Sequence, residues 1–103
     1  MRKLRYAKTF SGDLNALASS GAQRFGKAVA ETKIDDLLAI VLNFLLPQPK
    51  RGKRVRKLKL YKYEIRSAPL VVLYDFDADE VRIHTVVHAR SDIPNTDLST
   101  VEW

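Results

Sequence analysis

Two histidines and an arginine near the C-terminus are the residues of this chain best suited to acid–base chemistry. His84 and His88 are four residues apart, and Arg90 follows two residues later. A histidine can act as a general acid or base, and an arginine can stabilise charge on a phosphate under attack. The even spacing predicts that both histidines project from one face of a strand. The structural alternative is a strand-end histidine that bonds Asp92 or a neighbouring carbonyl.

A strongly basic segment lies upstream of these residues. Residues 50–62 hold eight of the eighteen lysines and arginines of the chain. Such a segment can bind phosphates or an acidic protein segment, although lysines on an edge strand also prevent aggregation. We favour the binding role and expect one cationic zone in a small sheet. The candidate binding residues are Arg54, Arg56, Lys57, Lys59, Lys62, Arg66, His88, Arg90 and Asp92.

An acidic stretch, residues 75–79, begins like a calcium-binding loop. Glu80 stands where that loop needs glycine, and Val86 stands where it needs a bidentate glutamate. We therefore predict a polar hairpin turn and no metal site. The absence of cysteine excludes disulfides, cysteine-based zinc sites and thiol catalysis. No cofactor is expected.

The composition predicts one domain over residues 1–103, because 103 residues with 46% hydrophobic content suffice for a single modest core. The 18 lysines and arginines exceed the 12 aspartates and glutamates, which gives a formal net charge of +6 and favours anionic or acidic partners. The charged N-terminus is not followed by an apolar segment. The apolar run of residues 37–46 is about half the length of a membrane span. We therefore expect a cytoplasmic protein without a membrane partner.

The N-terminal half predicts a short edge strand over residues 3–8 and two helices. Ser11 suits the N-cap of the first helix, and residues 19–21 allow a break within it. Thr32, with an aspartate three residues later, predicts the start of the second helix. Pro47 predicts its end, because proline removes a backbone donor and disfavours helix in the preceding residue.

The C-terminal half predicts strands. In residues 50–66 the apolar alternation changes parity between Leu60 and Tyr61, which indicates a bulge or tight turn joining two strands there. Residues 70–74 are a continuous apolar run, typical of a strand covered on both faces. A turn at 77–79 and a last strand at 81–87 follow. The fold class is therefore α+β: a short N-terminal strand, a two-helix hairpin, and a three- to four-stranded antiparallel sheet.

This order of segments resembles the RelE/ParE superfamily of type II toxin–antitoxin toxins over nearly the whole chain. The resemblance is carried by the basic strand 56–59, the strand 61–66, the central strand 70–76, the acidic hairpin, the strand 81–87 and the segment 88–94. The last segment, His-x-x-x-Asp-Ile-Pro, looks most like the ParE branch, whose members poison DNA gyrase. The resemblance implies a bacterial toxin that binds DNA gyrase and is neutralised by a cognate antitoxin. Such a toxin does no covalent chemistry itself.

The RelE branch implies a different activity, the cleavage of messenger RNA on the ribosome. This chain departs from that branch, because Val71 and Glu64 stand where RelE-like nucleases tend to carry basic residues, whereas Arg90 matches a terminal arginine. A ribosome-dependent mRNA endonuclease is the alternative function, and a non-toxic nucleic-acid-binding module is the second alternative. The catalytic candidates of the nuclease would be His88, Arg90, His84 and Arg66.

Further contacts are left open by the sequence. The apolar stripes of the two helices leave an outer groove that an antitoxin helix could cover, unless the sheet takes up all of this surface. Trp103 is either an anchor on the body of the protein or a contact for a partner. A homodimer and a toxin–antitoxin hetero-oligomer are both compatible with the sequence.

Overall fold

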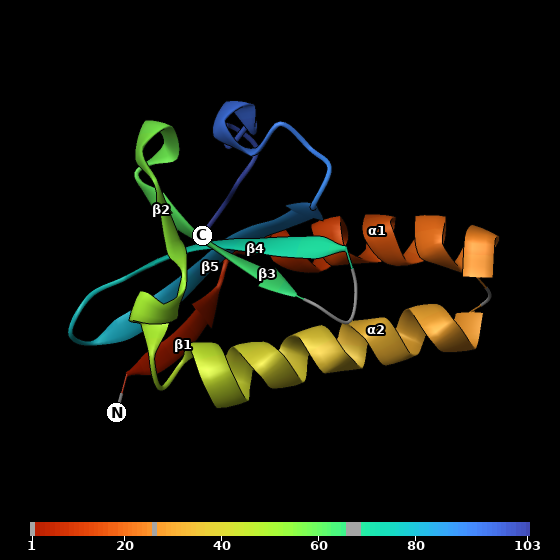
Figure 1. Cartoon of the computed structure of the whole chain (residues 1–103), viewed down its shortest axis with the longest axis horizontal. Coiled ribbons are helices and arrows are strands. Elements are labelled where there is room, and N and C mark those ends of the chain that lie inside the picture. The colour runs from red at the N-terminus through yellow and green to blue at the C-terminus, as the bar shows by residue number, and fades with distance from the viewer. Residues whose placement is uncertain (1, 26, 66–68) are drawn as a thin grey trace.

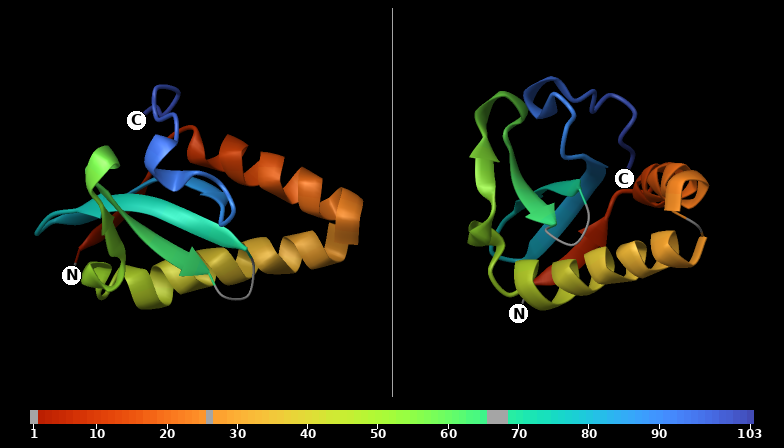
Figure 2. Two further views of the ribbon diagram at one scale, coloured as in Figure 1. Left: turned by 45° about the horizontal axis from the view of Figure 1, so that its top comes forward. Right: turned by 45° about the vertical axis from the view of Figure 1, so that its right-hand side comes forward.

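A helical hairpin covers one face of a β-sheet (Figure 1; Figure 2). The computed structural model of the chain describes residues 2–25, 27–65 and 69–103, without the side chains of residues 18, 20–31 and 33. The hairpin consists of α1 (Phe10–Phe25) and α2 (Lys27–Ile40). The strands are β1 (Lys3–Tyr6), β2 (Lys53–Val55), β3 (Leu60–Ile65), β4 (Leu70–Phe76) and β5 (Glu80–His88). The predicted α+β class is confirmed.

The sheet of the described residues has five strands in the order β1-β5-β4-β3-β2. β2 to β5 pair antiparallel in succession, as predicted, because short connections join consecutive strands. β1 lies at the other edge and runs parallel to β5. β1 ends at Tyr6 and not at residue 8, because the chain turns into α1 there. The Phe10 amide donates a hydrogen bond to the Ala7 carbonyl at 3.0 Å.

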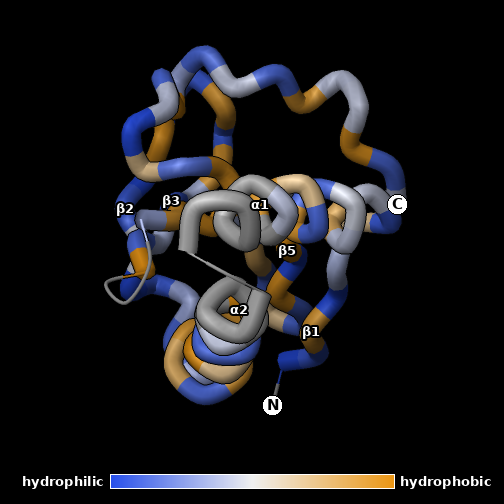
Figure 3. The backbone as a smooth tube through the Cα atoms, turned by 90° about the vertical axis from the view of Figure 1, so that its right-hand side faces the viewer, coloured by the Kyte–Doolittle hydropathy of each residue, from blue (hydrophilic) through white to orange (hydrophobic). Residues whose placement is uncertain are grey.

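Hydrophobic side chains fill both sides of the sheet. The cluster between helices and sheet contains Ala7, Phe10, Leu14, Leu37, Val41, Leu45, Leu46, Ile65, Val72, Tyr74, Val81, Ile83 and Val86. The second cluster contains Val55, Leu60, Val71, Leu73 and Ile93. β4 contributes alternate residues to each, so this strand is covered on both faces, as its continuous apolar run predicts. Figure 3 shows α1 and α2 side by side in front of strands rich in hydrophobic residues.

The first helix begins earlier than its capping pattern predicts. α1 starts at Phe10, so Ser11 lies within the helix and the predicted N-cap is wrong. Phe10 is buried, and its ring centroid lies 4.8 Å from that of Tyr6. Burial of this large side chain fixes the start of the helix more strongly than a hydroxyl cap one residue later. The helix continues through residues 19–21 without a break.

The second helix also begins before its predicted start. α2 starts at Lys27, so Thr32 is internal and the prediction is wrong. Ala28 and Ala30 precede Thr32 and are the strongest helix formers, so the helix extends past the local capping pattern.

The predicted end of the second helix is confirmed. α2 continues into a π-helical turn, Val41–Leu45, which closes before Pro47. Val41 and Leu45 face the core, whereas Leu42 and Phe44 are 53% and 49% exposed. No helix in the described part of the chain is long and apolar enough to cross a membrane.

The connection between β2 and β3 lies before the predicted position. A 3₁₀ turn, Arg56–Leu58, and Lys59 in the left-handed region (φ 56°) join the two strands. The prediction that residues 56–59 form a basic strand is therefore wrong, as is the turn at Leu60–Tyr61. The partly buried Leu58 packs against the second cluster from the turn. The sequence therefore shows the alternation of apolar and polar residues that is typical of a strand, although these residues form a turn.

A buried tyrosine holds the segment between α2 and β2. The Tyr74 hydroxyl donates to the Pro49 carbonyl at 2.5 Å and accepts from the Gly52 amide at 3.0 Å. A Cβ atom at Gly52 would lie 2.1 Å from that hydroxyl oxygen and 2.8 Å from the Lys62 carbonyl. Glycine is therefore required for this close approach, and burial raises the pKa of Tyr74 to about 12.

Candidate partner-binding surface

The basic residues of β2 and β3 divide between the two faces of the sheet. Lys53 lies opposite Lys62, whereas Arg54 lies opposite Tyr61 one residue along. Adjacent positions in a strand point to opposite faces, so Arg54 and Lys62 do not share a surface. The Arg54 guanidinium lies 5.0 Å from the centroid of the Tyr61 ring, a cation–π contact.

The other predicted cations gather at one end of β2. Arg56, Lys57 and Lys59 are exposed on the 3₁₀ turn. This turn lies beside the C-terminal segment, as both views of Figure 2 show. The Lys57 ammonium donates to the Asn95 side-chain carbonyl, and the Asn95 amide donates to the Asp92 carboxylate at 2.5 Å. We call these five residues the basic corner. The structure thus brings Lys57 and Asp92 together through Asn95.

The two histidines do not share a face. Leu73 pairs with Thr85, but Tyr74 pairs with Ile83, so His84 is an extra residue in β5. Such a bulge reverses the alternation of the strand beyond it. The core residues of β5 record this change, because Val81 and Ile83 are two apart whereas Val86 follows after three. The predicted common orientation of His84 and His88 is therefore wrong.

Of the nuclease candidates, His84 lies apart from His88 and Arg90. The His84 Nε2 atom lies 3.2 Å from the Asp75 carboxylate, toward the β4–β5 hairpin. His88 Nδ1 accepts a hydrogen bond from the Arg90 backbone amide at 3.1 Å, at the opposite end of β5. The side chain of Arg90 is exposed. Arg66 lies outside the described residues.

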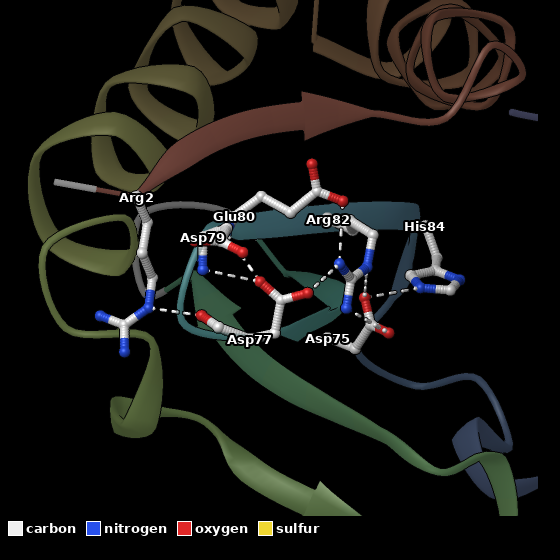
Figure 4. Close-up of polar contacts among 7 residues, drawn as sticks. All are labelled: Arg2, Asp75, Asp77, Asp79, Glu80, Arg82 and His84. Carbon is white, nitrogen blue, oxygen red and sulfur yellow. Dashed lines mark hydrogen bonds and ion pairs between the residues drawn. The ribbon is translucent and has the colours of Figure 1, made fainter.

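A cluster around Arg82 is the main polar feature that the sequence interpretation missed (Figure 4). The Arg82 guanidinium contacts Asp75, Asp77 and Glu80, each with a shortest distance of 2.8 Å. The hydrogen bonds that Arg82 donates, first to Asp75 and then to Asp77 and Glu80, raise the pKa of Arg82. The available signal in the sequence was the series of acidic residues, at two-residue spacing, before Arg82. The pairing of β4 with β5 brings them to the arginine, because Asp75 lies directly opposite Arg82 across the hairpin.

The Asp77 carboxylate closes the hairpin turn. It accepts hydrogen bonds from Arg82 and from the backbone amides of Asp79 and Glu80, at 2.8 Å, 2.8 Å and 2.9 Å. The Arg82 bond first, and then the two amides, lower the pKa of Asp77 to about 2. These carboxylates are thus occupied by the protein itself, and the described residues contain no group of three potential metal ligands. The predicted polar hairpin turn is confirmed.

Trp103 packs on the body of the protein. Its ring and the His84 ring are nearly perpendicular with centroids 4.8 Å apart, and the Arg5 guanidinium lies 5.2 Å from the Trp103 centroid. The Glu102 carbonyl accepts a hydrogen bond from the Lys8 amide at 2.6 Å. Of the two alternatives for Trp103, the structure therefore favours the anchor.

The surface as a whole suits binding more than catalysis. The basic corner presents several cations together, and the sheet presents others on each face. Among the described residues, the two histidines do not meet at one site. Such an arrangement can hold an acidic or anionic macromolecule through several charge contacts.

Comparison with known proteins agrees with the fold and the resemblance. Residues 4–93 match the family model of the ParE toxin of type II toxin–antitoxin system, parDE. A chain of the solved structure "Chromosomal ParDE TA system from P. aeruginosa" has a TM-score of 0.74 and 15% identity, with 85% of this chain and 96% of that chain covered. That likeness concerns the fold, and no curated protein matches in sequence. Because the family match covers most of its length, this chain belongs to the ParE toxin family of type II toxin–antitoxin systems.

Proposed function

We propose that this chain is a toxin that inhibits DNA gyrase and is held inactive by a cognate antitoxin. The match of residues 4–93 to the ParE toxin family carries this proposal. The similar fold in a ParDE toxin–antitoxin system supports the antitoxin as a partner. The formal net charge of +6 favours partners with acidic surfaces.

The proposed mechanism is binding and not bond cleavage. The toxin holds gyrase in a state in which cut DNA persists, so the covalent chemistry belongs to gyrase. The separation of His84 from His88 by the β5 bulge supports this mechanism, because a pair of acid–base groups must lie within reach of the same phosphate. Val71 is buried in the sheet and offers no cation there.

We assign the first contact with gyrase to the basic corner. Arg56, Lys57 and Lys59 are exposed on a short turn whose backbone is fixed between β2 and β3. The turn also packs beside the C-terminal 3₁₀ turn, Ile93–Asn95. A rigid cationic projection of this kind loses little conformational entropy on binding and steers an acidic partner toward it.

The test is a supercoiling assay with purified gyrase and the purified chain. We expect relaxed plasmid to persist and cleaved DNA to accumulate with the wild-type chain. We expect the cognate antitoxin, sought as the product of a reading frame beside the gene, to restore supercoiling. The double variant Arg56→Glu with Lys59→Glu should inhibit about tenfold less, because its charges oppose an acidic partner.

A parallel translation assay separates the alternative function. Intact supercoiling together with cut messenger RNA on ribosomes would replace the proposal with the nuclease reading. Normal supercoiling and normal translation would leave only the non-toxic module.

A further inference from the structure

An exposed apolar pair marks the end of α2. Leu42 and Phe44 are the large hydrophobic residues that the described part of the chain exposes, at 53% and 49%. They lie on the outer side of the π-helical turn, whose Val41 and Leu45 are buried.

A cationic depression adjoins this pair. Arg2, Pro47, Gln48, Pro49, Lys50 and Arg51 line an open depression of about 500 Å³. The Arg51 guanidinium lies 5.8 Å from the centroid of the Phe44 ring, so the depression and the apolar pair form one surface. We call it the π-turn surface and define it as Arg2, Leu42, Phe44 and residues 47–51.

Arg51 is exposed and is held in place by Gln48. Its Nε atom donates to the Gln48 side-chain carbonyl at 2.9 Å. In the described part of the chain its two terminal nitrogens have no hydrogen-bond partner, and neighbouring Lys50 is exposed. A planar guanidinium beside an aromatic ring suits a carboxylate that arrives together with apolar side chains.

The backbone under the π-turn surface is rigid. The buried Tyr74 hydroxyl bonds both the Pro49 carbonyl and the Gly52 amide. Two bonds from the core therefore fix the segment that carries Lys50 and Arg51. A surface fixed in this way loses little freedom when a partner binds.

We propose that the π-turn surface binds an amphipathic segment of the antitoxin. Apolar side chains of this segment cover Leu42 and Phe44, and its aspartate or glutamate residues pair with Arg51 and Lys50. This inference rests on the proposed function, because the antitoxin is the partner of the toxin. The surface and the basic corner lie at opposite ends of β2, so the antitoxin need not compete with gyrase for the same side chains.

Charge selects this occupant over a second copy of the chain. In a twofold dimer the same patch faces itself, so Lys50 and Arg51 of both copies would be brought together. Like charges at such an interface oppose association. An acidic segment instead neutralises them.

The test measures the dissociation constant between the intact chain and the purified product of the neighbouring reading frame. Two variants remove different parts of the surface, namely Leu42→Ser with Phe44→Ser, and Arg51→Glu. The control, Lys8→Glu, makes the same charge change at an exposed residue at the other end of β1. We expect each surface variant to weaken binding about tenfold or more, and the control less than about twofold. Circular dichroism melts verify that each variant is folded.

The outcomes separate this inference from the proposed function. Unchanged binding by folded surface variants would overturn the inference and leave the antitoxin as partner. Failure of the wild-type chain to bind the product of the neighbouring reading frame would overturn the inference and would also remove that product as the partner of the toxin. The wild-type chain could also form a dimer that the double variant, Leu42→Ser with Phe44→Ser, converts to a monomer. That result would assign the surface to a second copy of the chain and would also overturn the inference.

Discussion

At the scale of single residues, the hairpin cluster and the Tyr74 hydroxyl show how polar groups fix this fold. Arg82 neutralises three carboxylates at once, and Asp77 also caps the turn. The partners of these side chains come from strand pairing, so residue types alone did not reveal them. The spacing of the acidic residues is visible in the sequence, but only the register of β4 on β5 places Asp75 opposite Arg82.

Asp77 should make the stability of the fold depend on pH. Its pKa falls from 3.8 in the unfolded chain to about 2 in the folded chain. A depressed carboxylate pKa stabilises the fold above the unfolded value, and this stabilisation is lost as the pH falls through the folded value. We expect Asp77→Asn to lower the melting temperature at pH 6, with the difference shrinking between about pH 4 and pH 2. Thermal melts across this range measure it. Asp79→Asn is the control, and an equal loss there would contradict the assignment.

Tyr74→Phe tests the polar anchor beneath the π-turn surface. The substitution removes the hydroxyl that serves both Pro49 and Gly52, so it leaves a buried carbonyl and an amide without their partner. We expect a loss of about 1–3 kcal/mol in the free energy of unfolding, measured by urea denaturation. Tyr63→Phe is the matched control, because the Tyr63 hydroxyl makes no hydrogen bond within the described residues. A loss of the same size in the control would argue against the anchor.

At the scale of elements, hydrophobic pattern predicted most of the fold and pairing geometry explains the errors. The continuous run of β4 and the alternation of β5 were sufficient to predict both strands. The bulge at His84 was not visible, because a strand with one extra residue has the same composition as a regular strand. The turn at 56–59 was hidden because Leu58 keeps the alternation through it. Both errors changed which basic residues and histidines were expected to lie together.

Two glycines in different elements should respond to alanine in opposite directions. At Gly52 a Cβ atom would meet the Tyr74 hydroxyl at 2.1 Å, whereas at Gly12 within α1 it would meet nothing within 4 Å. We expect Gly52→Ala to destabilise the protein by more than about 1 kcal/mol, through strain or loss of the hydroxyl contact. Gly12→Ala should stabilise it by about 0.5–1 kcal/mol. Chemical denaturation of both variants measures these changes, and stabilisation by Gly52→Ala would contradict the close approach.

At the scale of the whole molecule, the two ends of the chain meet beside β5. β1 pairs with that strand, and the C-terminal segment bonds the residues that follow β1. These contacts lie at the β1 edge of the sheet, whereas the basic corner and the π-turn surface flank β2, the strand at the opposite edge. The fold thus separates the surfaces that we assign to gyrase and to the antitoxin.

Trp103→Ala should loosen the contact between the two ends of the chain. The substitution removes the ring that packs on His84 and lies beneath Arg5. We expect a loss of about 1–3 kcal/mol in the free energy of unfolding, since Trp103 is partly exposed. The Lys8 amide should also exchange its hydrogen faster, because its acceptor is the neighbouring Glu102 carbonyl. Glu102→Ala keeps that carbonyl and is the control. Unchanged exchange at Lys8 in Trp103→Ala would show that the indole does not hold the segment in place.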